Sequence, residues 1–417
     1  MDLFTTAHPF TTGVDISSDE FWSKPFDERD KAFARLRAEA PVSWHPPVSY
    51  PAPHGEQGFW AVTRAADITT VSMDSETFQS RNGFTLDPIG ASAAGGSFFL
   101  AMDPPEHSRY RSLVSAAFTP KQIKKIDDRI AANAHLIVDD LIGAGEVDFV
   151  EACSSRLPME TVSDIVGVPA SERKRVAQAA ENLFGAGEAH RMAPEEAVNL
   201  KMEEAIYLYS LAKDLAAHRR ANPADDLLTN LVQAEIDGHG LTDDDIGAFM
   251  LLMATAGNDT TKQTTSHTML SLAAHPEQRD WLMKDFDGRI MGAIEEFVRH
   301  ATPVMTFTRT ASRDVELNGA QIAAGDKVAM FYCSGNRDES VFDNAAAFDL
   351  SRPRFPRHVA FGGGGTHFCL GNGVAKVQLR SIIGELLRRL PDITFGTPVA
   401  MKSNFVNGIE SLPAHVG

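Results

Sequence analysis

Apolar residues recur at steps of three and four along much of the chain, which is the spacing of amphipathic helices. The clearest stretch runs from Ile123 to Leu141. Thr119 precedes it as a possible cap and Pro120 suits a first helical turn, so a helix is predicted to begin there. Further helices are predicted over residues 169–186, 194–221 and 276–300.

The longest predicted helix begins after Thr242 and ends before Pro276. Thr242 and Asp245 resemble a capping box, with Asp in the place of the usual Glu. About 30 residues at 1.5 Å each make a helix of about 45 Å, long enough to cross most of the molecule. Residues 246–256 are apolar nearly all round, which predicts burial on every side.

Short strands are predicted near residues 60–63, 311–323 and 327–331, with turns at Gly319 and Gly325. No internal repeat, low-complexity segment or linker interrupts the chain. We therefore expect a mainly α fold with a minor β portion, organised as a single domain over residues 1–417.

The 417 residues include 39 Lys and Arg against 56 Asp and Glu, a formal charge of −17. Such a surface repels phosphate, so nucleic acid is not an expected partner. The three cysteines, Cys153, Cys333 and Cys369, are too few and too scattered for a disulfide framework, which fits a reducing compartment. With no signal peptide and no long apolar run, we expect a cytoplasmic protein without a membrane anchor.

The segment 361–372, FGGGGTHFCLGN, is the most informative part of the chain. Four glycines allow a close approach of the backbone to another group. The amphipathic run 374–390 that follows predicts a helix, so Cys369 lies just before a helix N-terminus. That position lowers a thiol pKa, and a thiolate is a good axial ligand for haem iron.

Two other interpretations of this loop remain open on the residues alone. A phosphate-binding loop requires Gly-Lys-Ser/Thr after the glycines, and Thr366-His367-Phe368 does not supply it. Cys369 could instead be an inert buried cysteine beside a turn.

A second unusual segment, 256–261 with sequence AGNDTT, lies inside the longest helix. Gly257 in a buried helix costs about 1 kcal/mol relative to Ala. Asp259 and Thr260 tend to bond the backbone and bend it. Local unwinding would open a pocket and expose an acid and an alcohol to it; the alternative is a core kink with a satisfied Asp.

Together these segments resemble the cytochrome P-450 family. The loop resembles its haem signature, Phe-Gly-x-Gly-x-His/Arg-x-Cys-x-Gly, although Phe361 stands eight residues before the cysteine instead of seven. This longer loop is similar to the subgroup that oxidises sterol side chains and methyl-branched lipids. The resemblance implies haem b with Cys369 as the ligand of its iron, signature glycines at Gly365 and Gly371, and a propionate contact from His367.

The AGNDTT segment resembles the family motif Ala/Gly-Gly-x-Asp/Glu-Thr. By that resemblance Thr260 forms a hydrogen bond to dioxygen and Asp259 takes part in proton delivery. The implied fold is a triangular helical prism with the long helix over the haem. A structural lock is implied for Glu296, Arg299 and Arg352, and further propionate contacts for His107, Arg111, Arg309 and His358.

The resemblance also implies a hydrophobic pocket for a small-molecule substrate. Its expected lining is Phe98, Met253, Ala256, Gly257, Val304, Met305, Phe307, Phe405 and Val406. Segments 302–310 and 404–409 resemble the same subgroup, which implies hydroxylation of a steroid, terpenoid or branched lipid.

The chain contains no dinucleotide-binding glycine pattern and no iron–sulfur cysteine spacing. The resemblance therefore implies electrons from a [2Fe-2S]-type ferredoxin, fed by an NAD(P)H-dependent ferredoxin reductase, with the chain acting as a monomer. The alternatives are a peroxide-driven peroxygenase and a non-catalytic haem- or ligand-binding protein. The Asp259–Thr260 pair argues against both.

Overall fold

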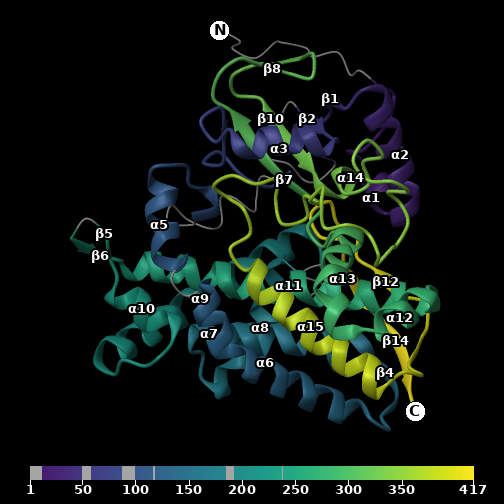
Figure 1. Ribbon diagram of the computed structural model, residues 1–417. Coiled ribbons are helices and arrows are strands. Elements are labelled where there is room, and N and C mark those ends of the chain that lie inside the picture. The colour runs from purple at the N-terminus through teal and green to yellow at the C-terminus, as the bar shows by residue number, and fades with distance from the viewer. Residues whose placement is uncertain (1–11, 49–57, 87–98, 116–117, 185–191, 237) are drawn as a thin grey trace.

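The computed structural model describes residues 12–48, 58–86, 99–115, 118–184, 192–236 and 238–417. The largest sheet lies at one end of the molecule with α2 (Phe26–Glu39) and α3 (Ala65–Met73), and most of the helices lie at the other end (Figure 1). The predicted class, mainly α with a minor β portion, is confirmed. Within the described residues, no helix has the length and apolar character needed to cross a membrane.

The helix α11 (Asp243–Ala274) runs through the centre of the helical part. The predicted capping box is present: the Thr242 side chain accepts from the Asp245 amide and the Asp245 side chain accepts from the Thr242 amide. Around α11 pack α7 (Arg156–Val166), α8 (Ala170–Phe184), α9 (Pro194–Ala221), α13 (Phe286–Ala301) and α15 (Asn372–Arg389). Most of the apolar stretch 246–256 is buried as predicted, but Met253 and Ala256 are not.

The other helices are mostly short. The exception is α6 (Pro120–Leu141), which is capped by Thr119 as predicted and packs along α15. The remainder are α1 (Asp19–Trp22), α2 (Phe26–Glu39), α3 (Ala65–Met73), α5 (Glu106–Ser115), α10 (Leu227–Gln233), α12 (Pro276–Met283) and α14 (Tyr332–Gly335), with a 3-10 turn η1 (Phe99–Ala101) and a π-helical turn η3 (Val150–Ser154).

The helix predicted over 276–300 is in fact two helices. The first, α12, ends at Met283, and α13 begins at Phe286. The Asp285 side chain accepts a hydrogen bond from the Gly288 amide and so caps the second helix. The prediction was wrong here because the apolar spacing continues across the break.

The largest sheet has the order β1-β2-β10-β7-β3. Its strands are β1 (Val42–His45), β2 (Phe59–Val62), β3 (Phe78–Gln79), β7 (Thr306–Ala311) and β10 (Lys327–Phe331). Smaller sheets pair β4 (Gly145–Asp148), β11 (Thr394–Phe395) and β14 (Pro413–Val416); β5 (Glu235–Ile236) and β6 (His239–Gly240); β8 (Val315–Leu317) and β9 (Ala320–Ile322); and β12 (Val399–Ala400) and β13 (Ile409–Ser411).

A buried ionic centre joins α13 to the segment that follows β10. The Arg299 guanidinium bonds both carboxylate oxygens of Glu296, at 2.6 and 2.8 Å. Its other N–H groups donate to three backbone carbonyls, those of Asn336, Ala345 and Ala347. Arg352 adds a 3.2 Å bond to Glu296. All five guanidinium donors of Arg299 are thus used, and the structure brings together the three residues expected to form a lock.

Candidate active site

One face of α11 forms the floor of a deep pocket. Phe249, Leu252, Met253, Ala256, Gly257, Thr260, Thr261 and Thr264 line it. These positions are separated by steps of three and four, so they share one side of the helix. The side of α11 that faces the pocket is therefore apolar along most of its length and carries hydroxyl groups at its C-terminal end.

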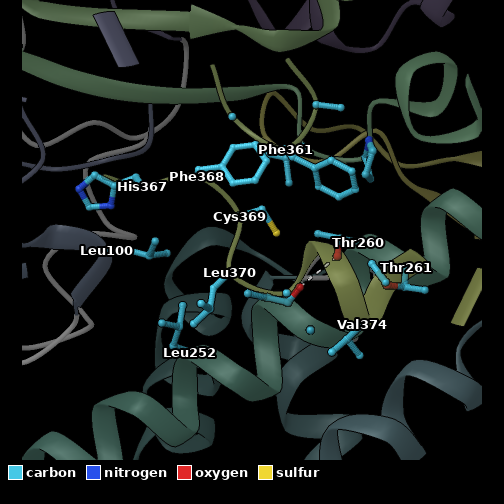
Figure 2. Close-up of a pocket in the computed structure, with 18 of the residues that line it drawn as sticks. Leu100, Leu252, Thr260, Thr261, Phe361, His367, Phe368, Cys369, Leu370 and Val374 are labelled. Carbon is cyan, nitrogen blue, oxygen red and sulfur yellow. Dashed lines mark hydrogen bonds between the residues drawn. The ribbon is translucent and has the colours of Figure 1, made fainter. Parts of the chain in front are cut away.

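The loop that carries Cys369 forms the opposite wall. Figure 2 shows the Cys369 sulfur directed into the space between this loop and the turn of α11 that holds Thr260. Phe361, Phe368 and Leu370 line the pocket from the same loop. A thiol and an alcohol from segments over one hundred positions apart in the sequence thus face one cavity.

The glycine-rich loop packs closely against helix α3, which leaves no room for side chains there. A Cβ atom on Gly365 would lie 2.1 Å from the backbone oxygen of Ser72, and its φ of +72° already favours glycine. The loop is closed at its other end by the Cys369 amide, which donates to the Phe361 carbonyl at 2.9 Å. The expected close contact of the loop backbone is therefore with α3. Gly365 does not itself line the pocket.

The Cys369 thiol lies at the start of α15, as the sequence predicted. Burial raises its pKa, and this effect outweighs the opposing influence of the Gly371 amide and the Arg111 charge. The lowering of the pKa expected from the helix N-terminus is present, through the Gly371 and Asn372 amides, but burial outweighs it. Burial also raises the pKa of Cys153 and Cys333, to about 12 in each case.

Basic side chains gather at the side of the pocket near α5. Arg111, Arg309 and His367 line it, and the ring of His107 lies 4.1 Å from that of His367. His107 is fully buried, and neither ring nitrogen has a hydrogen-bond partner among the residues that the structure describes. Burial lowers the pKa of His107 to about 4 and that of His367 to about 2, with neighbouring arginines adding to both shifts.

These groups fit a bound molecule that carries carboxylates. Arg309 is buried and donates to the carbonyl of Thr308, while a nearby acid, Asp103, is already paired with Arg81 at 2.8 Å. A buried cation is destabilising unless an anion pairs with it, and a buried ring nitrogen is destabilising without a hydrogen-bond partner. The two propionates of a haem are of the required charge, and Cys369 supplies a ligand for its iron.

Some of the residues expected to contact the propionates or to line the pocket lie elsewhere. His358 does not line the pocket; its Nε2 lies 3.1 Å from a carboxylate oxygen of Glu295. Val304 lines the pocket, but the next residue, Met305, turns to the other side of the extended chain, where its sulfur lies 3.4 Å from Arg29.

Phe405 and Val406 form a second layer behind the lining. The Phe405 ring packs edge-on against Phe307 at 5.4 Å, and Val406 forms an isolated β-bridge with Val304. Phe307, Val304, Met253, Ala256 and Gly257 do line the pocket, as does Gly371. Phe98 lies outside the described residues.

The helix around Thr260 is continuous, so the expected unwinding does not occur. A Cβ on Gly257 would lie 2.5 Å from Val162 of α7, which indicates that glycine is required there for helix packing. The Thr260 hydroxyl donates to the Ala256 carbonyl at 3.0 Å. Asp259 points away from the lining face, and its Oδ1 lies 2.7 Å from Nζ of Lys262.

Some lining residues gave no signal in the sequence. Phe118, Val162 and Ile165 come from outside the family motifs. Phe118 precedes α6, and Val162 and Ile165 lie on α7, where they reach the pocket because α7 packs against α11. Leu100, in the 3-10 turn η1, is a further lining residue outside these motifs.

The comparisons with known proteins agree with this geometry. The cytochrome P-450 family model matches residues 197–392. A methyl-branched lipid omega-hydroxylase of Mycobacterium tuberculosis is 38% identical over 407 residues, covering 96% of this chain and 94% of that protein. The chain belongs to the cytochrome P-450 family. The family predicted from the two motifs is thereby confirmed.

Other members of the family extend this similarity. A steroid C26-monooxygenase of Mycolicibacterium smegmatis is 35% identical, covering 90% of this P-450 and 88% of that protein. A solved Mycobacterium marinum cytochrome P-450 in complex with pseudoionone is 50% identical, with a TM-score of 0.94 over 98% of this chain and 99% of that one. The protein is a P-450 monooxygenase, and its family implies a haem iron.

Proposed function

We propose that this P-450 hydroxylates an unactivated C–H bond of a neutral hydrophobic substrate: a terpenoid, a steroid or a methyl-branched lipid. The observation that carries the proposal is the shared pocket, in which the apolar face of α11 and Thr260 lie opposite Cys369 (Figure 2). The relatives named above act on lipids and steroids, and the structural relative contains a linear terpenoid ketone.

The chemical character of the lining supports a neutral substrate. Aromatic rings from Phe84, Phe99, Phe249 and Phe307 surround the space, and the described lining contains no Asp, Glu or Lys. Its cationic side chains belong to the propionate cluster. An ionised substrate would therefore be desolvated without a partner of opposite charge, at a cost of several kcal/mol.

We assign the haem contacts to the residues that fit them. Cys369 would hold the iron, Arg111 and Arg309 would neutralise the propionates, and His107 and His367 would donate hydrogen bonds to them. When bound, a haem b supplies the chemistry that activates dioxygen for insertion of one oxygen atom into the substrate. His358 is not part of this assignment.

Thr260 and Asp259 have distinct roles in this proposal. Thr260 lines the pocket, but its hydroxyl donates to the Ala256 carbonyl. The hydroxyl must therefore rotate before it can donate to a bound molecule. Asp259 lies on the adjacent face of α11, paired with Lys262. This ion pair must break before Asp259 can pass a proton to the pocket. Together they form a proton path from the helix interior to Thr260.

The electrons come, in this proposal, from a [2Fe-2S]-type ferredoxin and an NAD(P)H-dependent reductase in the bacterial cytoplasm, with the P-450 acting as a monomer. The support is the family itself and the absence of a flavin or iron–sulfur motif in the sequence. Peroxide-supported turnover without a reductase would favour the peroxygenase alternative instead.

One spectroscopic experiment tests the core of the proposal. The reduced protein with carbon monoxide is expected to show the strongly red-shifted Soret band of a thiolate-bound haem, and Cys369→Ala is expected to remove it. Titration with pseudoionone, a steroid and a methyl-branched fatty alcohol then ranks the substrate classes by their spectral shifts. A haem-replete protein without that band would overturn the assignment of Cys369.

A further inference from the structure

An ionic cluster lies behind the haem-binding loop, outside the lining of the pocket. Nζ of Lys376, on α15, is 2.7 Å from Oε1 of Glu295, on α13. The second carboxylate oxygen of Glu295 lies 3.1 Å from Nε2 of His358. All three side chains are mostly buried. His358, which the sequence had suggested for a propionate, is therefore committed to this cluster.

The cluster is joined to the loop through Phe361. The Lys376 ammonium lies 5.1 Å from the centroid of the Phe361 ring, and the His358 ring centroid lies 5.5 Å from it. Although the loop is one residue longer than usual, Phe361 still lines the pocket. The Phe361 carbonyl accepts a hydrogen bond from the Cys369 amide. Phe361 therefore lies directly between the cluster and Cys369.

Glu295 is ionised at neutral pH. Burial alone would raise the pKa of Glu295, but the hydrogen bonds from His358 and Lys376 and the Lys376 charge lower it to about 2. The Lys376 ammonium packs on Phe361, whose carbonyl accepts the Cys369 amide, so its charge acts on negative charge that collects at the Cys369 sulfur.

We propose that Lys376 and Glu295 set the reduction potential of the haem iron bound to Cys369, with His358 as a positioning residue for Glu295. The inference rests on the proposed ligand role of Cys369. Reduction moves one electron from the ferredoxin to the iron, so the haem–thiolate unit gains one negative charge and no bond is broken. The Lys376 ammonium stabilises that added charge, and the Glu295 carboxylate opposes it.

The test is the reduction potential of the substrate-free holoenzyme, measured by spectroelectrochemical titration. Lys376→Met is expected to make reduction less favourable by about tenfold, which is about 59 mV for a one-electron couple. Glu295→Gln is expected to shift the potential in the opposite direction. Lys376→Arg keeps the charge and is expected to match the unmodified protein.

Arg388→Met is the matched control on the same helix. It removes a cation 12 residues further along α15, about 18 Å away by helical rise, and is expected to leave the potential unchanged. An unchanged potential in Lys376→Met, with its carbon monoxide band intact, would overturn the inference. So would shifts of the same sign in Lys376→Met and Glu295→Gln.

The outcomes also separate this inference from the proposed function. Absence of the thiolate band in the unmodified protein would overturn the ligand role of Cys369 itself. If Lys376→Met does not retain haem, Glu295→Gln decides: a more positive potential supports the inference, and an unchanged one contradicts it.

Discussion

Lys262 and Asp259 form an ion pair within one turn of α11, with 2.7 Å between Nζ and Oδ1. Lys262 is only 1% exposed, and Glu181 of α8 lies 3.4 Å from the same nitrogen. Burial alone would lower the pKa of Lys262, but the two carboxylates raise it, so the side chain is a cation. The residue assigned to proton delivery is thus held by a buried partner that the sequence analysis did not identify.

Lys262→Met is expected to destabilise the protein by about 3 kcal/mol, because it leaves the Asp259 carboxylate buried without its cation. The double variant Lys262→Met/Asp259→Asn is expected to recover part of that loss. Urea unfolding of the four proteins in this cycle measures the coupling. Additive effects of the two substitutions would contradict a direct interaction.

Thr260→Ala is expected to leave haem binding intact and to lower product formation by about 100-fold relative to NAD(P)H consumption. The reason is that the pocket loses the hydroxyl that faces Cys369. Thr265→Ala is the control, because its hydroxyl bonds the Thr261 carbonyl within the same helix and does not line the pocket. Equal coupling in both variants would remove the role given to Thr260.

Gly365→Ala is expected to lower stability by about 2 kcal/mol or more and to reduce haem content, because the added methyl meets the backbone of Ser72 at a positive φ. Gly371→Ala is its partner experiment. Its φ is −81° and no atom lies within 4 Å of the added Cβ, so its thermal unfolding should change by less than about 1 kcal/mol. Similar losses in both variants would show that the contact with α3 is not what requires glycine.

Val304 and Met305 are adjacent and lie on opposite sides of the chain. Val304→Ala is expected to change the affinity for pseudoionone several-fold, since about 1 kcal/mol of apolar contact is lost in the pocket. Met305→Ala is expected to cost about 2 kcal/mol or more in stability and to leave ligand affinity unchanged. Spectral titration and urea unfolding of both variants make the comparison, and the reverse pattern would contradict the placement of these side chains.

His45 predicts a loss of stability in acid. It is 2% exposed, and burial lowers its pKa from 6.5 to about 4, against the opposing charge of Asp15. Between these values the unfolded chain binds a proton that the folded protein does not, so stability falls as the pH falls from 6.5 to 4. The loss is about 3 kcal/mol over that window. His45→Gln should flatten this part of the curve in urea unfolding at successive pH values; an unchanged slope would assign the loss to other groups.

The sequence predicted best the features that depend on neighbouring residues. Thr119 and Pro120 start α6, and the Thr242–Asp245 box starts α11, because a cap is completed within three or four positions. Cys369 and the lining face of α11 follow from motif and helical spacing in the same way.

The misplaced predictions involve contacts between distant segments. Gly257 had suggested an unwound turn, whereas its lack of a side chain accommodates Val162 from another helix. His358 had suggested a propionate contact, whereas Glu295, 63 positions earlier, is its partner. Neither partner could be chosen from spacing, because each depends on how whole helices cross.

The Arg299 centre has a consequence for the order in which the chain can assemble. Its guanidinium needs carbonyl groups that lie up to 48 positions further along the chain, at Asn336, Ala345 and Ala347. During synthesis from the N-terminus, α13 emerges before these carbonyl groups. Until they are made, burying the Arg299 guanidinium costs a large desolvation free energy. The helices that pack on α13 are therefore expected to close over Arg299 only after the segment through Ala347 has been made.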